Sequence, residues 1–213
     1  ATYSDWLLRQ INDPAFENSN ASFYDLMLHL THEFSDKDRL YISAYMSSDK
    51  FKLNEDSTYS YHNRNASIKW KHDFSRKFYM VITGGIDDYK YEVAGSNNPH
   101  DAFTLKFGVQ QINTKADFNY APNNKHAIDF GVQNIIYDID PGSLQPANSA
   151  SLVKPNVLEK ENGTETAMYL GDQYKMTNKL SFQAGIRYSF YRYVGPQKVY
   201  TYAPGQPRDE NTI

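Results

Sequence analysis

The chain of 213 residues has no cysteine, and this absence removes several kinds of site at once. Disulfide bridges, thiolate metal sites and a thiol nucleophile are all excluded. No stretch approaches 18 consecutive apolar residues, so the sequence predicts no transmembrane helix. Its 22 basic and 25 acidic side chains form no basic run. Nucleic acid is therefore not an expected partner.

Aromatic residues are abundant in a chain that is otherwise polar. There are 18 Tyr and 12 Phe, while the mean hydropathy is only −0.70. Aromatic side chains favour strands. A low mean hydropathy together with many aromatic residues is typical of sheets with one face exposed to water. Transmembrane barrels have the same hydrophilic average, because their strands alternate apolar and polar residues.

Much of the chain alternates with a period of two. In RLYISAYMS, Leu40, Ile42 and Ala44 fall on one face, and Tyr41 and Ser43 fall on the other. A period of two predicts strands. The stretch that contains Trp70 repeats the pattern with lysines on both sides of the indole, which a helix would place on one turn.

We predict an all-β, antiparallel up-and-down meander of about eight long strands, in four hairpins. A phase slip near Gln110 and Gln111 predicts a β-bulge. Asp172 interrupts the alternation of 164–176 and leaves the faces of that strand open. The expected short turns lie near 35–38, 75–77, 121–125 and 177–179, and the long loops near 48–64, 92–102, 138–163 and 194–213.

Sorting of short turns to one side and long loops to the other is typical of outer-membrane barrels, with periplasmic turns and extracellular loops. On this interpretation the chain, 1–213, is a single β-barrel segment. Leu26, Leu28 and Leu30 face lipid, and Asp25, Met27 and His29 face the lumen. Aromatics near strand ends fit the girdles at membrane interfaces. They fit a soluble barrel or sandwich core as well.

Three stretches together resemble TonB-dependent outer-membrane receptors of the Bacteroidetes type. They are SFYDLMLHLTHEFSDKDRLYISAYMSSDKF, KADFNYAPNNKHAIDFGVQ and AMYLGDQYKMTNKLSFQAGIRYSFY followed by GPQKVYTY, in the order that the family has. The last contains Gly185, Ile186, Arg187 and Tyr188. The resemblance implies a fragment from the middle of a 22-stranded transmembrane barrel, without the plug domain and without the segment that contacts TonB.

If the resemblance holds, the parent protein takes up a scarce nutrient, such as a siderophore, glycan, peptide or vitamin, across the bacterial cell outer membrane. The implied partners are the lipid bilayer, the rest of the barrel and the plug, through which the TonB complex acts. Starch-utilisation-type relatives also use a surface lipoprotein. The substrate-binding residues stay unknown, because loops decide the substrate.

No residue set predicts catalysis, a cofactor or a metal, and we expect no enzyme. His29 and His32 are three apart and face opposite sides of a strand, which does not suit a metal pair. Asp138 and Asp140 lack the spacing of a calcium loop and are expected in a turn. Lys69, the nearby Lys71 and Asp73 are expected to line the lumen.

Two other functions stay open from the residues alone. One is a complete small eight-stranded outer-membrane barrel that acts as an adhesin or pore. The other is a soluble carbohydrate-binding β-domain, in which the apolar faces of the strands pack on one another. The direction in which the faces of Leu40, Ile42 and Ala44 point distinguishes the soluble alternative from the membrane ones.

Overall fold

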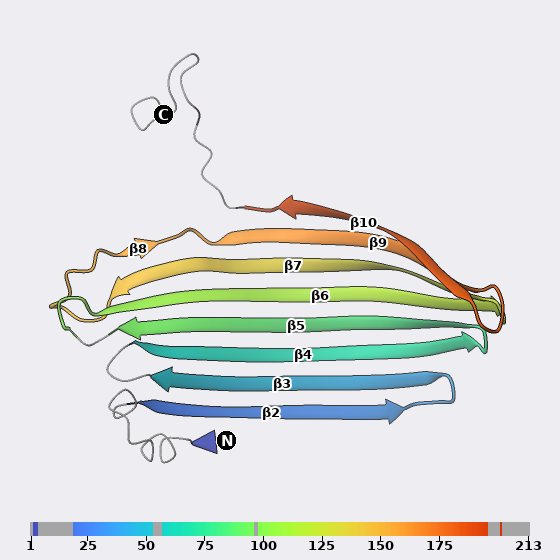
Figure 1. Cartoon of the computed structure of the whole chain (residues 1–213), viewed down its shortest axis with the longest axis horizontal. Coiled ribbons are helices and arrows are strands. Elements are labelled where there is room, and N and C mark those ends of the chain that lie inside the picture. The colour runs from blue at the N-terminus through green and yellow to red at the C-terminus, as the bar shows by residue number, and fades with distance from the viewer. Residues whose placement is uncertain (1, 4–18, 53–56, 96–97, 196–200, 202–213) are drawn as a thin grey trace.

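The protein forms one continuous antiparallel sheet in the computed structural model, which describes residues 2–3, 19–52, 57–95, 98–195 and 201. Figure 1 shows the strands side by side in chain order. Eight are long and two have only two residues. The strands are β1 (Thr2–Tyr3), β2 (Asn20–Glu33), β3 (Asp38–Lys52), β4 (Thr58–Ser75), β5 (Phe78–Gly95), β6 (Phe103–Asn123), β7 (His126–Pro146), β8 (Asn156–Val157), β9 (Glu161–Lys175) and β10 (Ser181–Tyr193).

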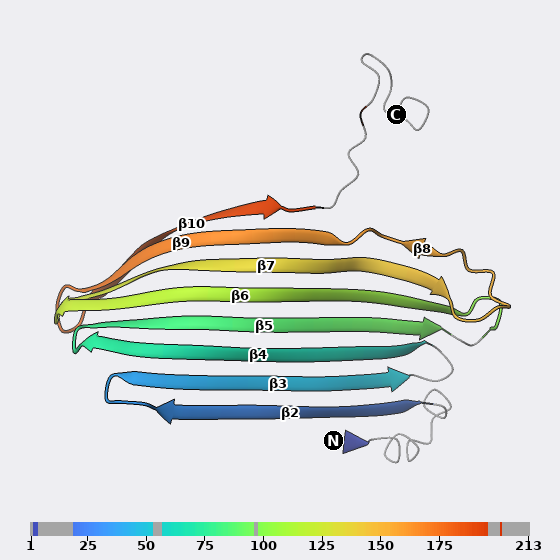
Figure 2. The same cartoon turned by 180° about the vertical axis from the view of Figure 1, so that it is seen from behind.

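The sheet is an up-and-down meander in which each long strand pairs with the next. β8 pairs with β7 beside the main path. Among the described strands the sheet does not close: β10 pairs with β9 alone, and β2 has only the two-residue β1 beyond it. In Figure 2 these two edges lie on opposite sides of the sheet. The expected fold class, a meander from a transmembrane barrel, is confirmed.

Four short turns join the hairpins, and each begins with the same hydrogen-bonding device. The Ser35 hydroxyl accepts from the backbone N–H groups of Lys37 and Asp38, at 3.2 and 3.1 Å. The other three turns begin with a similar acceptor, namely Ser75, Asn123 and Thr177. Small polar side chains hold tight turns in this way. The four turns lie at one end of the sheet, at the right in Figure 1.

The strands are longer than the sequence predicts at the opposite end. β3 runs on to Lys52 and β4 begins at Thr58, inside the loop expected near 48–64. β5 reaches Gly95, so the second loop is shorter than 92–102, and β7 continues to Pro146, inside the loop expected near 138–163. At the turn end, Ala121 to Asn123 belong to β6, which leaves only residues 124–125 in the third turn. Residues 196–213 fall outside the described residues, except 201.

Few side chains are buried in the described part of the sheet. Among all described residues, only three apolar ones are buried: Val93 and Ala167 in strands and Ala102 just before β6. Large apolar side chains are exposed instead, for example Ile68 at 49% and Met168 at 60%. A soluble domain buries such residues in a core. This sheet therefore needs an apolar environment on at least one face.

Candidate binding surface on the inner face

Each long strand carries its apolar residues on one face at the turn end. We call this the outer face. Register places Leu26, Leu28 and Leu30 of β2 opposite Met46, Ala44 and Ile42 of β3, so all six share this face. The apolar outer band continues across β4 to β10 with Ala66, Ile68, Trp70, Met80, Ile82, Ile86, Ile112, Phe118, Phe130, Val132, Ile136, Met168, Leu170, Ile186 and Tyr188.

The band ends at a sharp border on four neighbouring strands. Ala66, Ile86, Ile112 and Ile136 form one row of cross-strand partners. The next outer row toward the long-loop end is Arg64, Asp88, Gln110 and Asp138. We call this second row the border row. Charge in the hydrocarbon is costly, so the change from four apolar to four polar or charged residues marks where these strands leave lipid.

Beyond the border row the polarity of the two faces is inverted. In β5 the outer residues become Asp88, Lys90 and Glu92, while Tyr89 and Tyr91 occupy the inner face. β6 does the same, and this explains the phase slip near Gln110 and Gln111. The predicted β-bulge there is wrong, because pairing runs unbroken from Asp88↔Gln110 to Asp87↔Gln111.

The real register shifts of β6 lie elsewhere. Both are in its pairing with β7: one between Lys106 and Gly108, the other between Tyr120 and Asn123. At the border row the apolar side chains change from the outer face to the inner face, while the strand pairing continues without an inserted residue.

The inverted inner face carries a strip of aromatic rings across β3 to β6. We call it the inner aromatic strip: Phe51, Tyr59, Tyr61, Tyr89, Tyr91 and Phe107. Phe51 stacks on Tyr59 at 4.9 Å between ring centroids, with 12° between the planes. Tyr61 lies 5.0 Å from Tyr91, and Tyr89 lies 6.4 Å from Phe107. Cross-strand aromatic pairs of this kind stabilise a sheet, and together they place six rings on one face of four neighbouring strands.

Burial raises the pKa of the Tyr91 phenol, and the neighbouring Tyr61 and Tyr59 raise it further. Tyr91 lies beyond the border row, outside the segments that cross the membrane. At neutral pH its hydroxyl is therefore a neutral group that donates and accepts hydrogen bonds.

A row of amides and carboxylates borders the aromatic strip on its turn side. Asp87 accepts hydrogen bonds from the side-chain amides of Asn65 and Gln111, the latter at 3.1 Å. Asn63 donates to the Ser47 hydroxyl at 3.3 Å. A hollow that includes Tyr45, Asn63, Asp87 and Gln111 lies here. These groups present both donors and acceptors to whatever occupies the inside.

Nearer the turns, the inner face is a polar wall with its own network. The Lys115 ammonium lies 2.8 Å from the Asp117 carboxylate, which accepts from the Tyr169 hydroxyl. Arg187 donates to Gln133 at 3.0 Å, and its guanidinium lies 5.6 Å from the Tyr169 ring. The wall surrounds a shallow hollow of about 640 Å³.

Two glycines make room for tyrosines on this wall. A Cβ at Gly131 would collide with the Tyr169 side chain and with the Ala116 carbonyl. A Cβ at Gly163 would collide with Tyr191. Aromatic rings that cover glycines of a neighbouring strand hold the register of such pairs. Sequence reasoning missed this pairing, because it depends on which strands are neighbours.

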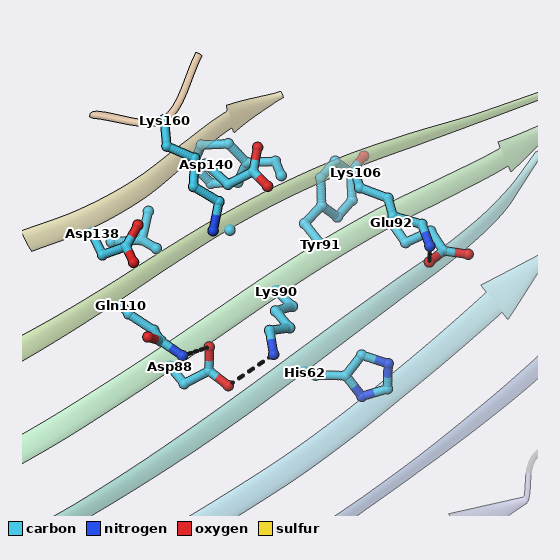
Figure 3. Close-up of a pocket in the computed structure, with 13 residues that line it drawn as sticks. His62, Asp88, Lys90, Tyr91, Glu92, Lys106, Gln110, Asp138, Asp140 and Lys160 are labelled. Carbon is cyan, nitrogen blue, oxygen red and sulfur yellow. Dashed lines mark hydrogen bonds and ion pairs between the residues drawn. The ribbon is translucent and has the colours of Figure 1, made fainter. Parts of the chain in front are cut away.

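A separate pocket opens on the outer face beyond the border row, with a volume of about 380 Å³. Figure 3 shows its charged rim from β4 to β7, together with Lys160 just before β9. Lys90 pairs with Asp88 at 3.3 Å, and Lys106 pairs with Glu92 at 3.4 Å. All of these side chains lie on the part of the wall that extends past the apolar band.

Polar residues inside the outer band bond one another, whereas the Oδ1 atom of Asp172 is buried without a hydrogen-bond partner among the described residues. Asn134 accepts from the hydroxyls of Thr166 and Thr164, at 2.8 and 3.1 Å. Asp172 shares the outer face with Leu170 and lies 2.6 Å from Nδ1 of His126. Lipid offers no hydrogen bonds, so such groups need partners within the protein. Register thus settles the faces of 164–176, which the sequence left open.

The residues weighed for chemistry in the sequence are not brought together as a site. His29 bonds Ser43 on the inner face at 2.9 Å, whereas His32 contacts Phe34 on the outer face. Asp138 lies in β7 rather than in the expected turn, as does Asp140, because the strand runs on past the band. Lys71 pairs with Asp73 at 3.0 Å on the inner face, which Lys69 shares. Within the described ranges, no three acidic or histidine side chains are placed to hold a metal ion.

No helix in the described part of the chain is long and apolar enough to span a membrane. An apolar outer band, a sharp border row and a polar inner wall define the class of protein: this chain is a wall segment of an outer-membrane β-barrel. The family described as "TonB dependent receptor-like, beta-barrel" matches residues 2–211, and the chain belongs to that family.

Solved structures with a similar fold are distant in sequence. BauA, the ferric preacinetobactin receptor from Acinetobacter baumannii, gives a TM-score of 0.65 at 13% identity, over 86% of this chain. The match covers 36% of BauA, so this chain spans about a third of its length. The translocator domain of autotransporter NalP from Neisseria meningitidis gives 0.47 at 9% identity, over 84% of this chain and 62% of that one. No curated protein matches this sequence.

Proposed function

We propose that this chain supplies barrel wall and extracellular loops to a TonB-dependent transporter that takes up a scarce nutrient across the bacterial outer membrane. The inversion of the two faces at the border row supports this proposal most. On the turn side of the border row the apolar side chains lie on the outer face, where lipid would contact them. On the long-loop side they lie on the inner face. A wall of this kind offers an incoming solute a surface on the inside, beyond the membrane.

The open edges of the described sheet support the same proposal. Among the described strands, β10 has one neighbour and β2 has beyond it only a two-residue strand, so both edges present unpaired backbone groups. In lipid these groups need further strands. We propose that the remaining barrel strands of the parent protein supply them, and that a plug inside the barrel connects the inner wall to the TonB complex. A surface lipoprotein is a further candidate partner.

The test is uptake by cells that do or do not make the complete protein. Deletion of its gene should reduce uptake of at least one nutrient from a set of iron chelates, vitamins, oligosaccharides and peptides. An uncoupler that collapses the proton gradient should reduce the same uptake, because transport of this type is energised from the inner membrane. Uptake that the uncoupler does not reduce would indicate a passive pore. No change in any uptake would indicate an adhesin.

A further inference from the structure

At and beyond the border row, the described cationic side chains of β3 to β6 are confined to the outer face, whereas acidic side chains lie on both faces. Every described Lys, Arg and His of β3 to β6 in this region lies on the outer face: Lys50, Lys52, His62, Arg64, Lys90 and Lys106. In this region the inner face of the same strands has no described cation and carries Asp49, and Asp87 lies one row nearer the turns. The nearest inner cations, Lys69 and Lys115, lie further toward the turns and line a hollow together with Asp87. Asp25 on β2 adds a further acidic group.

The placement of the cations on the outer face bears on which solute the inner aromatic strip can accept. An anionic ligand, such as a ferric catecholate, is normally held by Arg or Lys, which pair with its oxygens. Here it would meet aromatic faces and carboxylates, and the nearest carboxylates would repel it. The described inner surface therefore suits a ligand without net negative charge.

The arrangement of the rings indicates the shape of that ligand. Phe51 is nearly parallel to both Tyr59 and Tyr61, with interplanar angles of 12° and 8°. Rings that bind a compact cation converge around one point, whereas these lie next to one another along the wall. Four neighbouring strands span roughly 14 Å, at about 4.8 Å between strands. The strip is thus long enough for a chain of linked sugar rings.

The row of amides beside the strip supplies the matching polar groups. Asn63, Asn65 and Gln111 each offer an acceptor oxygen and donor N–H groups, and Asp87 offers acceptors. Hydroxyl groups both donate and accept, so they satisfy such a row more completely than a carboxylate or an ammonium group. Apolar ring faces beside alternating donors and acceptors suit the two sides of a pyranose.

We propose that the inner aromatic strip with its amide row binds a neutral oligosaccharide of about three sugar units. The proposal rests on the proposed function, since it names the substrate class of that transporter. The rings stack on the sugar faces, and Asn63, Asp87 and Gln111 bind the hydroxyls. The described residues of the aromatic strip include no cation, and this selects against anionic chelates there; Lys69 and Lys115 lie on the turn side of the amide row.

Binding to the complete protein, purified in detergent, tests the proposal. The probes are an array of neutral oligosaccharides, a ferric tris-catecholate as the anion, and hexalysine as the cation. We expect at least one neutral oligosaccharide to bind and neither charged probe to bind. Tyr61→Ala and Tyr91→Ala should each weaken saccharide binding about tenfold or more, as loss of an aromatic anchor does. Tyr120→Ala, on the outer face, should leave it unchanged.

Tyr61→Phe and Tyr91→Phe keep the ring and should retain binding within a few-fold. A shift of the folded band on heating checks that every variant is assembled. Binding of the catecholate or of hexalysine in a manner that Tyr61→Ala abolishes would overturn the proposal. So would an array on which no neutral saccharide binds, and this wild-type result does not depend on any variant.

Failure of this inference can be told apart from failure of the proposed function. If uptake needs the proton gradient but the transported solute is an anionic chelate, the proposed transport function holds and the proposed saccharide ligand is wrong. If the protein binds a saccharide but no uptake depends on it, the proposed ligand class holds and the proposed transport function is wrong.

Discussion

At the scale of single residues, Gly131 shows how the inner wall depends on one missing side chain. Its Cβ would enter the space of Tyr169, whose hydroxyl bonds Asp117. Gly131→Ala should therefore displace the ring and disturb the links of Tyr169 to Lys115 and Arg187. Overpacking of this kind costs about 1–3 kcal/mol. Urea unfolding of the complete protein in lipid vesicles measures the change.

Gly171 is the matched control on the neighbouring strand. A Cβ there would come no closer than 3.5 Å to the Ala184 carbonyl oxygen, which is ordinary contact. Gly171→Ala should be neutral or slightly stabilising, since alanine loses less backbone entropy than glycine on folding. Equal destabilisation by both changes would show that Tyr169 does not need the space at Gly131.

Tyr91 gives a prediction for alkaline pH. Burial raises the pKa of its phenol above the ordinary value of 10.0. The folded state then keeps a proton that the unfolded state loses near pH 10, so the unfolding free energy falls as pH rises through and beyond this value. Below pH 10 the contribution is fully present.

An absorbance titration of phenolate compares the wild type with Tyr91→Phe. The difference curve isolates one of the 18 tyrosines of this chain, and its midpoint should lie above pH 10. A midpoint at or below pH 10 would show that the strip leaves Tyr91 exposed to water.

At the scale of strands, the period of two carried most of the information in the sequence. The eight long strands and four turns were predictable, because Ser35, Ser75 and Thr177 stand where alternation stops. The strand extensions were not. In β4 the apolar positions change from even numbers, as at Ile68, to odd numbers at Tyr61. If one face is assumed to be apolar along the whole strand, the part of the strand beyond the border row looks like a loop.

The inner aromatic strip was missed for the same reason. Tyr59 and Tyr61 fall inside the loop predicted near 48–64, and Phe107 lies close to the bulge predicted at Gln110 and Gln111. The sequence does contain one signal of the strip. Beyond the phase change, apolar or aromatic residues still alternate with polar ones in the opposite phase, and the alternating partners are charged, as at Lys90. The contacts within the strip depend on register between strands, and one sequence does not contain that information.

The outer band makes a prediction about two adjacent residues of β4. Ile68 is on the outer face, with Ile42 and Gly84 as cross-strand partners, and Ser67 is on the inner face, between Ser43 and Gly85. Ile68→Lys should destabilise the barrel by up to about 2–4 kcal/mol, because it places a charge in hydrocarbon. Ser67→Lys adds the same charge to the polar wall and should cost little.

Refolding of the complete protein into lipid vesicles measures both changes, with the heat-shifted band on a gel as the readout. Similar folded yields for the two variants would mean that lipid does not contact the Ile68 face. A greater loss for Ser67→Lys would reverse the assignment of the faces.

At the scale of the whole molecule, the separation of turns from longer connections predicts an orientation across the membrane. The chain has no cysteine, so a single introduced thiol reports its own location. Asn148 lies in the connection from β7 to β9, and Asn124 lies in the turn from β6 to β7; both are exposed, at opposite ends of the sheet.

In the complete protein, with any cysteine elsewhere replaced, Asn148→Cys should react with a membrane-impermeant maleimide in intact cells. Asn124→Cys should react only after the outer membrane is permeabilised, because short turns of such barrels face the periplasm. The reverse pattern would mean that the sheet crosses the membrane in the opposite orientation. The inner aromatic strip would then lie on the periplasmic side, where an incoming solute would reach it last. Labelling of both sites in intact cells would mean that the outer band does not separate two compartments.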